Sequence, residues 1–154
     1  MKRLKLWGIA LGICVTTGSL TATQGQAEKK NDRTPTCTVA TLKGRYLFGG
    51  TSTRLPPAVP QPSLFAVAGY HIFNGDGTGT DTVTVSIDGV TVADNFVTPI
   101  GYTVDANCTG TFTIPASGES FGVFIAPDGE ELMLIGTNPG AVVVLGPSRR
   151  VARK

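Results

Sequence analysis

The side chains best suited to hold an ion lie in the segment FNGDGTGTDTVTV, residues 73–85, where two carboxylates stand among three glycines. Carboxylate oxygens in a glycine-rich loop are typical of calcium sites. The segment from Asp76 to Thr84 departs from the extracellular calcium motif Gly-Gly-x-Gly-x-Asp-x-apolar-x only at its first position. That motif binds calcium between stacked repeats, whereas this chain holds a single copy. We therefore interpret the segment as a hairpin turn between two strands. Asp76 and Asp81 remain the calcium alternative, and we predict no metal and no cofactor.

The only histidine of the chain, His71, is the side chain best suited to exchange a proton near neutral pH. It stands between Tyr70 and Ile72, so in a strand it lies on the opposite face from both neighbours. If that face points into a barrel, His71 could act as a general base or anchor a ligand. The simpler interpretation, which we favour, is a wall residue with one hydrogen-bond partner. Tyr46 is the second weak catalytic candidate, because a tyrosine in a strand can orient a ligand.

The N-terminal sequence MKRLKLWGIALGICVTTGSLTATQGQA is typical of a secretory signal peptide, which we place at residues 1–27. It has a basic start, an apolar core from Leu6 to Val15 and small residues before the cleavage site at Ala27. The apolar run is far shorter than the roughly 20 residues of a membrane-spanning helix. We therefore predict cleavage, a secreted or periplasmic location and no stable membrane insertion afterwards.

Two cysteines, Cys37 and Cys108, remain after cleavage. An even pair in an exported chain predicts one disulfide. A catalytic thiol is the alternative, but a cysteine nucleophile normally needs a partnered base, and His71 is the only histidine.

Basic residues are concentrated at the two ends of the mature chain. Between residues 34 and 148, three basic side chains stand against nine carboxylates. An acidic body is unsuited to a phosphate backbone, so we predict no nucleic-acid partner. We interpret the basic C-terminal sequence PSRRVARK as a solvated tail rather than as an anion-binding surface.

Short β-rich runs separated by turns recur along the chain, and no helical periodicity follows the signal peptide. In SLFAVAGYHIFN, apolar residues occupy both the odd and the even positions, as in a strand covered on both faces. In TGTDTVTVSI, apolar and polar residues alternate. VTVADNFVTP and GYTVDAN are predicted as separate runs, and the proline-rich segment 56–62 as a loop. This pattern predicts an all-β antiparallel meander closed as a small barrel, with a β-sandwich as the alternative.

Four segments together resemble bacterial exported proteins with an allene oxide cyclase barrel-like domain. They are CTVATLKGRYLFGG, AVAGYHIFNGDGTGTDTVTVS, GYTVDANCTGTFTI and FGVFIAPDGEELMLI. The resemblance covers about residues 37–151 and implies an eight-stranded, calycin-like up-and-down barrel. The plant enzymes of this kind cyclise an unstable fatty-acid epoxide in an apolar cavity and are trimers. No catalytic residue is carried over, because their polar residues lie in segments that do not align with this chain.

The predicted organisation is a signal peptide at 1–27, a flexible leader at 28–36, a barrel at 37–151 and a basic tail at 152–154. The first functional hypothesis is a barrel that binds a small apolar ligand in its interior, with residues 56–62 beside its mouth as a lid. The alternatives are a cyclase or isomerase of a reactive lipid-like or polyene substrate, and a structural module that forms homo-oligomers. The predicted lining residues are Tyr46, Phe48, Phe65, His71, Phe73 and Phe112.

Overall fold

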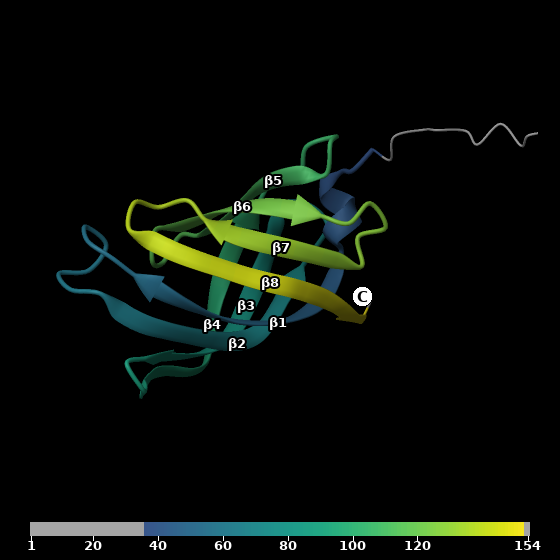
Figure 1. Cartoon of the computed structure of the whole chain (residues 1–154). Coiled ribbons are helices and arrows are strands. Elements are labelled where there is room, and N and C mark those ends of the chain that lie inside the picture. Colours follow the sequence, from purple (N-terminus) through teal and green to yellow (C-terminus); the bar gives the residue numbers. More distant parts are fainter. Residues whose placement is uncertain (1–35, 153–154) are drawn as a thin grey trace, which may run out of the picture. The chain divides into compact units, whose positions relative to one another are not determined.

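The chain folds into a closed antiparallel β-barrel (Figure 1). The structure, a computed structural model, describes residues 36–152. Eight strands follow one another around the barrel in chain order, and the last pairs with the first. This confirms the predicted all-β, eight-stranded barrel and not the sandwich. The strands are β1 Gly44–Arg54, β2 Ser63–Phe73, β3 Thr78–Ile87, β4 Val90–Tyr102, β5 Thr109–Ile114, β6 Glu119–Ile125, β7 Glu131–Gly136 and β8 Ala141–Ala152. The signal peptide and most of the predicted leader lie outside the described residues.

The glycine-rich segment forms the turn of the β2–β3 hairpin, as predicted. Gly75 and Gly77 have φ angles of 90° and 93°, a conformation that side chains rarely adopt. The amide of Asn74 donates to the carbonyl of Thr78 at 2.9 Å and closes the turn. Because the hairpin is symmetrical about this turn, His71 pairs directly with Asp81.

One row of inward-facing side chains crosses four neighbouring strands. The strand register pairs Tyr46 of β1 with His71 of β2, His71 with Asp81 of β3, and Asp81 with Thr98 of β4. Side chains of directly paired residues point to the same face of a sheet. All four residues are buried. The barrel wall therefore places a polar row across an otherwise apolar interior.

The outer face of β2 differs from the sequence-based expectation. Leu64 is 67 % exposed and Tyr70 39 % exposed, so the strand is covered on one face only. Apolar residues at both odd and even positions of β2 therefore do not mean that both faces of this strand are covered. Among the described residues, no second layer packs over this part of the barrel.

Strand β4 is one long strand where the sequence predicts two runs. Asn95 has a φ of 47°, and the β3–β4 ladder shifts register between Val83 and Val85. This irregularity bends β4 without ending it. On its other side, β4 pairs with β5 at only two positions, Gly101 with Thr113 and Tyr102 with Phe112. The β4–β5 seam is consequently the shortest ladder in the barrel.

One end of the barrel is closed by the segment before β1. Residues Val39–Leu42 form a single 3-10 turn, η1, which the sequence did not predict, and Leu42 is fully buried. The predicted disulfide between Cys37 and Cys108 is present and ties this segment to the β4–β5 turn. A buried disulfide of this kind fits an oxidising compartment.

Residues 147–152 of the C-terminal sequence belong to the barrel, so for them the interpretation as a solvated tail is wrong. Strand β8 continues to Ala152, and the Arg150 side chain is only 6 % exposed. Its guanidinium donates to the Tyr46 hydroxyl, the Glu130 carboxylate and the Thr41 carbonyl. The Tyr46 hydroxyl in turn donates to the carbonyl of Gly129. Arg150 therefore links η1, β1 and the β6–β7 turn at the closed end.

Two buried tyrosines at this end predict a loss of stability in alkali. Burial raises the pKa of Tyr46 and of Tyr102 above the ordinary value of 10.0, although the Arg150 guanidinium lowers that of Tyr46 in part. Unfolding therefore releases protons from these tyrosines above pH 10. Their contribution to the free energy of unfolding is constant below that pH and is lost as pH rises through the folded pKa values. We expect Tyr46→Phe to make this fall shallower, measured by urea denaturation from pH 8 to 12. The exposed Tyr70→Phe is the control, and equal slopes in both variants would contradict the prediction.

Candidate functional site

A buried histidine–aspartate pair lies inside the barrel. The His71 Nδ1 and Asp81 Oδ1 atoms are 2.8 Å apart, and the two side chains are 1 % and 2 % exposed. The β2–β3 hairpin positions both, because paired inward residues of adjacent strands bring their side chains together. The favoured sequence-based interpretation of His71, a wall residue with one hydrogen-bond partner, describes this contact.

Aromatic rings hold the imidazole in place. Phe48 stacks on His71 with ring centroids 3.8 Å apart and an interplanar angle of 7°. Phe112 meets it edge-on at 5.2 Å, and Phe73 lies tilted at 5.7 Å. The ring therefore cannot rotate freely, and its unbonded edge keeps a fixed direction.

The second ring nitrogen of His71 has no partner. Within residues 36–152, Nε2 is buried and makes no hydrogen bond. A carboxylate can only accept hydrogen bonds, so the contact with Asp81 places a proton on Nδ1. In the neutral ring, Nε2 is then an unused acceptor. A buried polar atom of this kind is costly unless a ligand or water satisfies it.

A cavity of about 70 Å³ adjoins the His71–Asp81 pair. Its polar lining consists of His71, Asp81, Thr98 and Glu119. The remaining lining residues are apolar: Phe48, Phe65, Val67, Val83, Val85, Phe112, Ile114, Phe121, Val143 and Leu145. We call this space the inner cavity. It has room for several waters or a few carbon atoms, since an aromatic ring needs a cavity of about 150 Å³.

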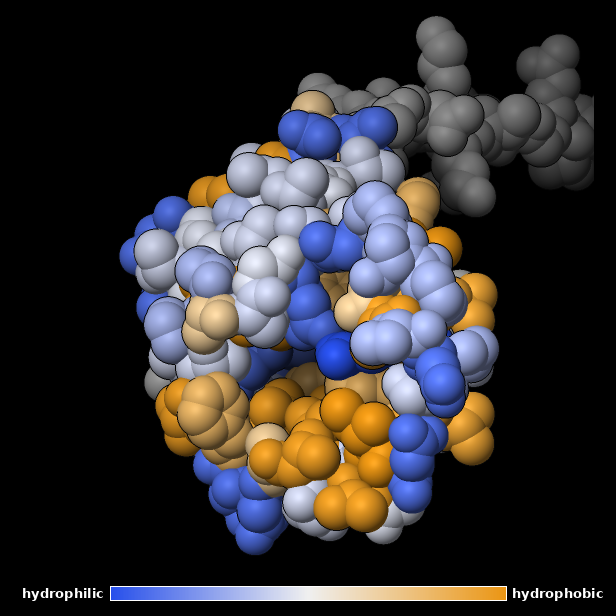
Figure 2. All heavy atoms as spheres, turned by 90° about the vertical axis from the view of Figure 1, so that its left-hand side faces the viewer, coloured by the Kyte–Doolittle hydropathy of each residue, from blue (hydrophilic) through white to orange (hydrophobic). Residues whose placement is uncertain are grey.

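A wider hollow of about 310 Å³ adjoins the inner cavity toward the open end of the barrel. We call it the outer chamber. Both spaces share Phe65, Val83, Val85, Thr98, Ile114 and Glu119 as lining residues. The outer chamber also reaches Val92, Ala93 and Phe96 of β4 and the β5–β6 turn, so it lies where β4 is not paired with β5. Figure 2 looks onto this end and shows a hollow with hydrophobic side chains gathered on one side of it.

An ion pair lies at the rim of the outer chamber. The Arg54 guanidinium binds the Glu119 carboxylate, and both side chains are partly exposed. Arg54 also covers the ring of Phe65, with its Cζ 4.6 Å from the ring centroid. The proline-rich loop lies next to this rim, since Pro57 and Arg54 line one shallow hollow with Glu119.

The predicted lining residues fall into two groups. Phe48, Phe65, His71 and Phe112 line the inner cavity. Tyr46 and Phe73 do not line it, because they pack toward the closed end, where their rings meet at 5.3 Å. The barrel is therefore filled by side chains in its closed half and hollow in its open half.

The carboxylates of the calcium alternative are separated. Asp76 accepts hydrogen bonds from the amide and hydroxyl of Thr78, which lowers its pKa below the ordinary value. Asp81 faces the interior and contacts His71. Among the described residues, no cluster of three or more His, Cys, Asp or Glu side chains could hold a metal ion.

Asp81 was considered in the sequence only as a calcium ligand, and its pairing with His71 was missed. The signal was present, because residues 71 and 81 are equidistant from the centre of the predicted turn at residue 76. Equal spacing from a hairpin turn predicts direct pairing. The contributions of Thr98, Glu119 and Arg54 had no comparable signal. Register shifts in the β3–β4 ladder hide the pairing of Thr98 with Asp81, and Arg54 and Glu119 lie 65 residues apart in the sequence.

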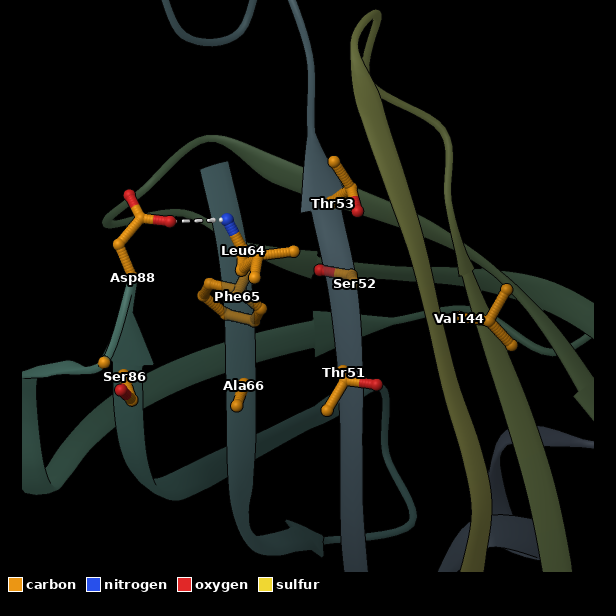
Figure 3. A pocket seen from close by; sticks show the side chains of 10 residues that line it. Thr51, Ser52, Thr53, Leu64, Phe65, Ala66, Ser86, Asp88 and Val144 are labelled. Carbon is orange, nitrogen blue, oxygen red and sulfur yellow. Dashed lines mark hydrogen bonds between the residues drawn. The ribbon is translucent and has the colours of Figure 1, made fainter. Parts of the chain in front are cut away.

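The largest hollow, of about 630 Å³, lies elsewhere and is a weaker candidate (Figure 3). It is an open groove lined largely by small side chains of β1 and β2. Its carboxylate, Asp88, already accepts a hydrogen bond from the amide of Leu64 at 2.8 Å. Asp88 is the only charged residue among those that line the groove, so the groove does not bring several charged groups together around a ligand.

No protein family model matches this chain, and no curated protein or solved structure does so either. Within the described residues, no helix is long and apolar enough to cross a membrane.

Proposed function

We propose that the protein is an exported β-barrel that binds a small apolar ligand through its open end. The observation that carries this proposal is the apolar outer chamber, which adjoins an inner cavity lined in part by His71, whose Nε2 atom is buried and unsatisfied. Ligand pockets are mostly apolar with a few convergent polar groups. The volume of the outer chamber alone is at the lower end of the roughly 300–1,000 Å³ range of such pockets.

Export to the periplasm or the extracellular space is part of this proposal. It rests on the signal-like sequence of residues 1–27 and on the disulfide between Cys37 and Cys108. Kinship with the allene oxide cyclase barrel-like proteins is a further part of it. The closed eight-stranded barrel agrees with what that resemblance implies.

Filling the outer chamber tests the proposal. We expect Ala93→Trp to weaken binding of the neutral fluorescent probe N-phenyl-1-naphthylamine by about tenfold or more, because the indole occupies the space of the ligand. Fluorescence titration measures the affinity. Ala68→Trp is the matched control, since Ala68 is an exposed strand residue on the outer face. Probe binding that is absent from the unmodified protein, or unaffected by Ala93→Trp, would contradict the proposal.

A cyclase or isomerase is the second candidate. The buried His71–Asp81 pair beside an apolar cavity supports it, because a dyad of this kind can serve as a general base. It would act on a reactive lipid-like or polyene substrate held in the outer chamber. Turnover above the uncatalysed rate distinguishes this candidate from binding alone.

Assembly of copies of the chain is the third candidate. Phe124, Met133, Ile135 and Val144 are each about half exposed. They lie together on the outside of β6, β7 and β8, where Phe124 pairs with Met133 and Ile135 with Val144. Exposed apolar patches often mark interfaces. Light scattering of the purified protein measures its oligomeric state.

A further inference from the structure

The chemistry of the inner cavity follows from the one polar atom that lacks a partner there. His71 is fully buried, and its Nε2 atom makes no hydrogen bond within residues 36–152. The imidazole is fixed by the Phe48 stack and by Asp81, so it cannot turn this atom to another partner. A ligand that hydrogen-bonds to Nε2 satisfies this buried acceptor.

Asp81 determines which kind of group Nε2 can bind. The carboxylate accepts a hydrogen bond from the Nδ1–H group, so in a ring that carries this one proton Nε2 has a lone pair and needs a hydrogen-bond donor. Thr98, the neighbouring polar side chain, makes only a long contact of 3.5 Å to the Pro99 carbonyl. The inner cavity therefore presents an acceptor to the ligand and a buried negative charge behind it.

The charge of Asp81 and the volume of the inner cavity further restrict the chemical groups that can bind there. A carboxylate at this position would bring a second negative charge close to Asp81 in an apolar surrounding, which is strongly unfavourable. The inner cavity of about 70 Å³ has about half the volume of an engineered cavity of roughly 150 Å³ that binds benzene in another protein. The group at its inner end is thus neutral, narrow and able to donate a hydrogen bond.

We propose that the inner cavity recognises the hydroxyl group of an aliphatic alcohol, which donates a hydrogen bond to Nε2 of His71. This inference rests on the proposed ligand-binding function and specifies its ligand. The hydrocarbon chain of the alcohol lies along the apolar walls shared by the two spaces, including Val85 and Ile114, and extends into the outer chamber.

Three compounds of matched shape test the proposal by displacement of N-phenyl-1-naphthylamine from the whole protein. They are the alcohol 2-undecanol, the ketone 2-undecanone and the hydrocarbon 2-methylundecane. We expect the alcohol to bind at least about fivefold more tightly than the ketone, because only the alcohol donates a hydrogen bond. Equal affinities would overturn the hydroxyl assignment while leaving the binding function standing. Binding of none of the compounds, or of the probe, would overturn both.

Nitrogen-15 NMR of the imidazole gives an independent measurement, and the single histidine makes the assignment unambiguous. We expect the ligand-free ring to carry its proton on Nδ1, and the Nε2 resonance to move upfield on addition of the alcohol but not of the ketone. A proton on Nε2 in the ligand-free protein would overturn the proposal.

The double variant H71F/D81V removes the acceptor to which the hydroxyl group is proposed to bind. It removes both members of the pair, so no buried charge is left without a partner. We expect it to retain affinity for the hydrocarbon and to lose the preference for the alcohol over the ketone. A preference that persists in this variant would place the hydroxyl elsewhere and overturn the proposal.

Discussion

Replacing both disulfide cysteines, as Cys37→Ser with Cys108→Ser, is expected to lower the free energy of unfolding by about 4 kcal/mol. The bond closes a loop with a sequence separation of 71 residues, which restricts the unfolded chain strongly. It also ties η1, which closes one end of the barrel, to the β4–β5 turn. Urea denaturation of the double variant and the unmodified protein measures the difference.

Replacing both cysteines avoids a free thiol, whose side reactions would complicate a single variant. The unmodified protein in a reducing agent is the control, and its stability should approach that of the double variant. A loss below about 1 kcal/mol would contradict the chain-entropy argument and show that the packing of Leu42 and the hydrogen bonds of Arg150 hold the closed end without the disulfide.

The second large effect concerns the buried pair. His71→Phe is expected to destabilise the barrel by about 3 kcal/mol, because it leaves the buried Asp81 carboxylate without its hydrogen-bond donor. Phenylalanine preserves the stack on Phe48, so the loss reports the charge rather than the packing. Chemical denaturation of the variant gives the value.

A double-mutant cycle isolates this effect. Adding Asp81→Val to His71→Phe removes the orphaned charge, and we expect the double variant to recover most of the lost stability. The stability losses of the two single variants, His71→Phe and Asp81→Val, would then not add up in the double variant. If the double variant is less stable than His71→Phe alone, the buried carboxylate is not the cause and the prediction is wrong.

Local signals were sufficient for much of the fold. The alternation from Thr80 to Ile87 and the glycine turn before it predict the β2–β3 hairpin with its register. His71 and Asp81 are brought together by that hairpin alone, so their contact was predictable in principle. The pairing of Cys37 with Cys108 followed from counting, because no other cysteine lies outside the predicted signal peptide.

Features that depend on distant segments were not predictable in this way. The basic C-terminus looks solvated in isolation, and only the fold brings Arg150 to Tyr46, which lies 104 residues earlier. Likewise, nothing local shows that η1 closes one end or that β4 runs unbroken past Asn95. The two hollow spaces depend on how the sheet closes, because the same apolar residues could have filled the barrel completely.

The short β4–β5 ladder has a consequence for how molecules enter and leave. Only Gly101 and Tyr102 of β4 are paired with β5, so the first part of β4 is held laterally by β3 alone. The interface between β4 and β5 is the smallest between neighbouring strands, and past Tyr102 it continues only through the backbone bonds from Thr103 to Thr111 and from Asp105 to Thr109. For the apolar ligand proposed above, we therefore expect a sideways route past the unpaired part of β4, with a residence time that follows the opening of the β3–β4 hairpin.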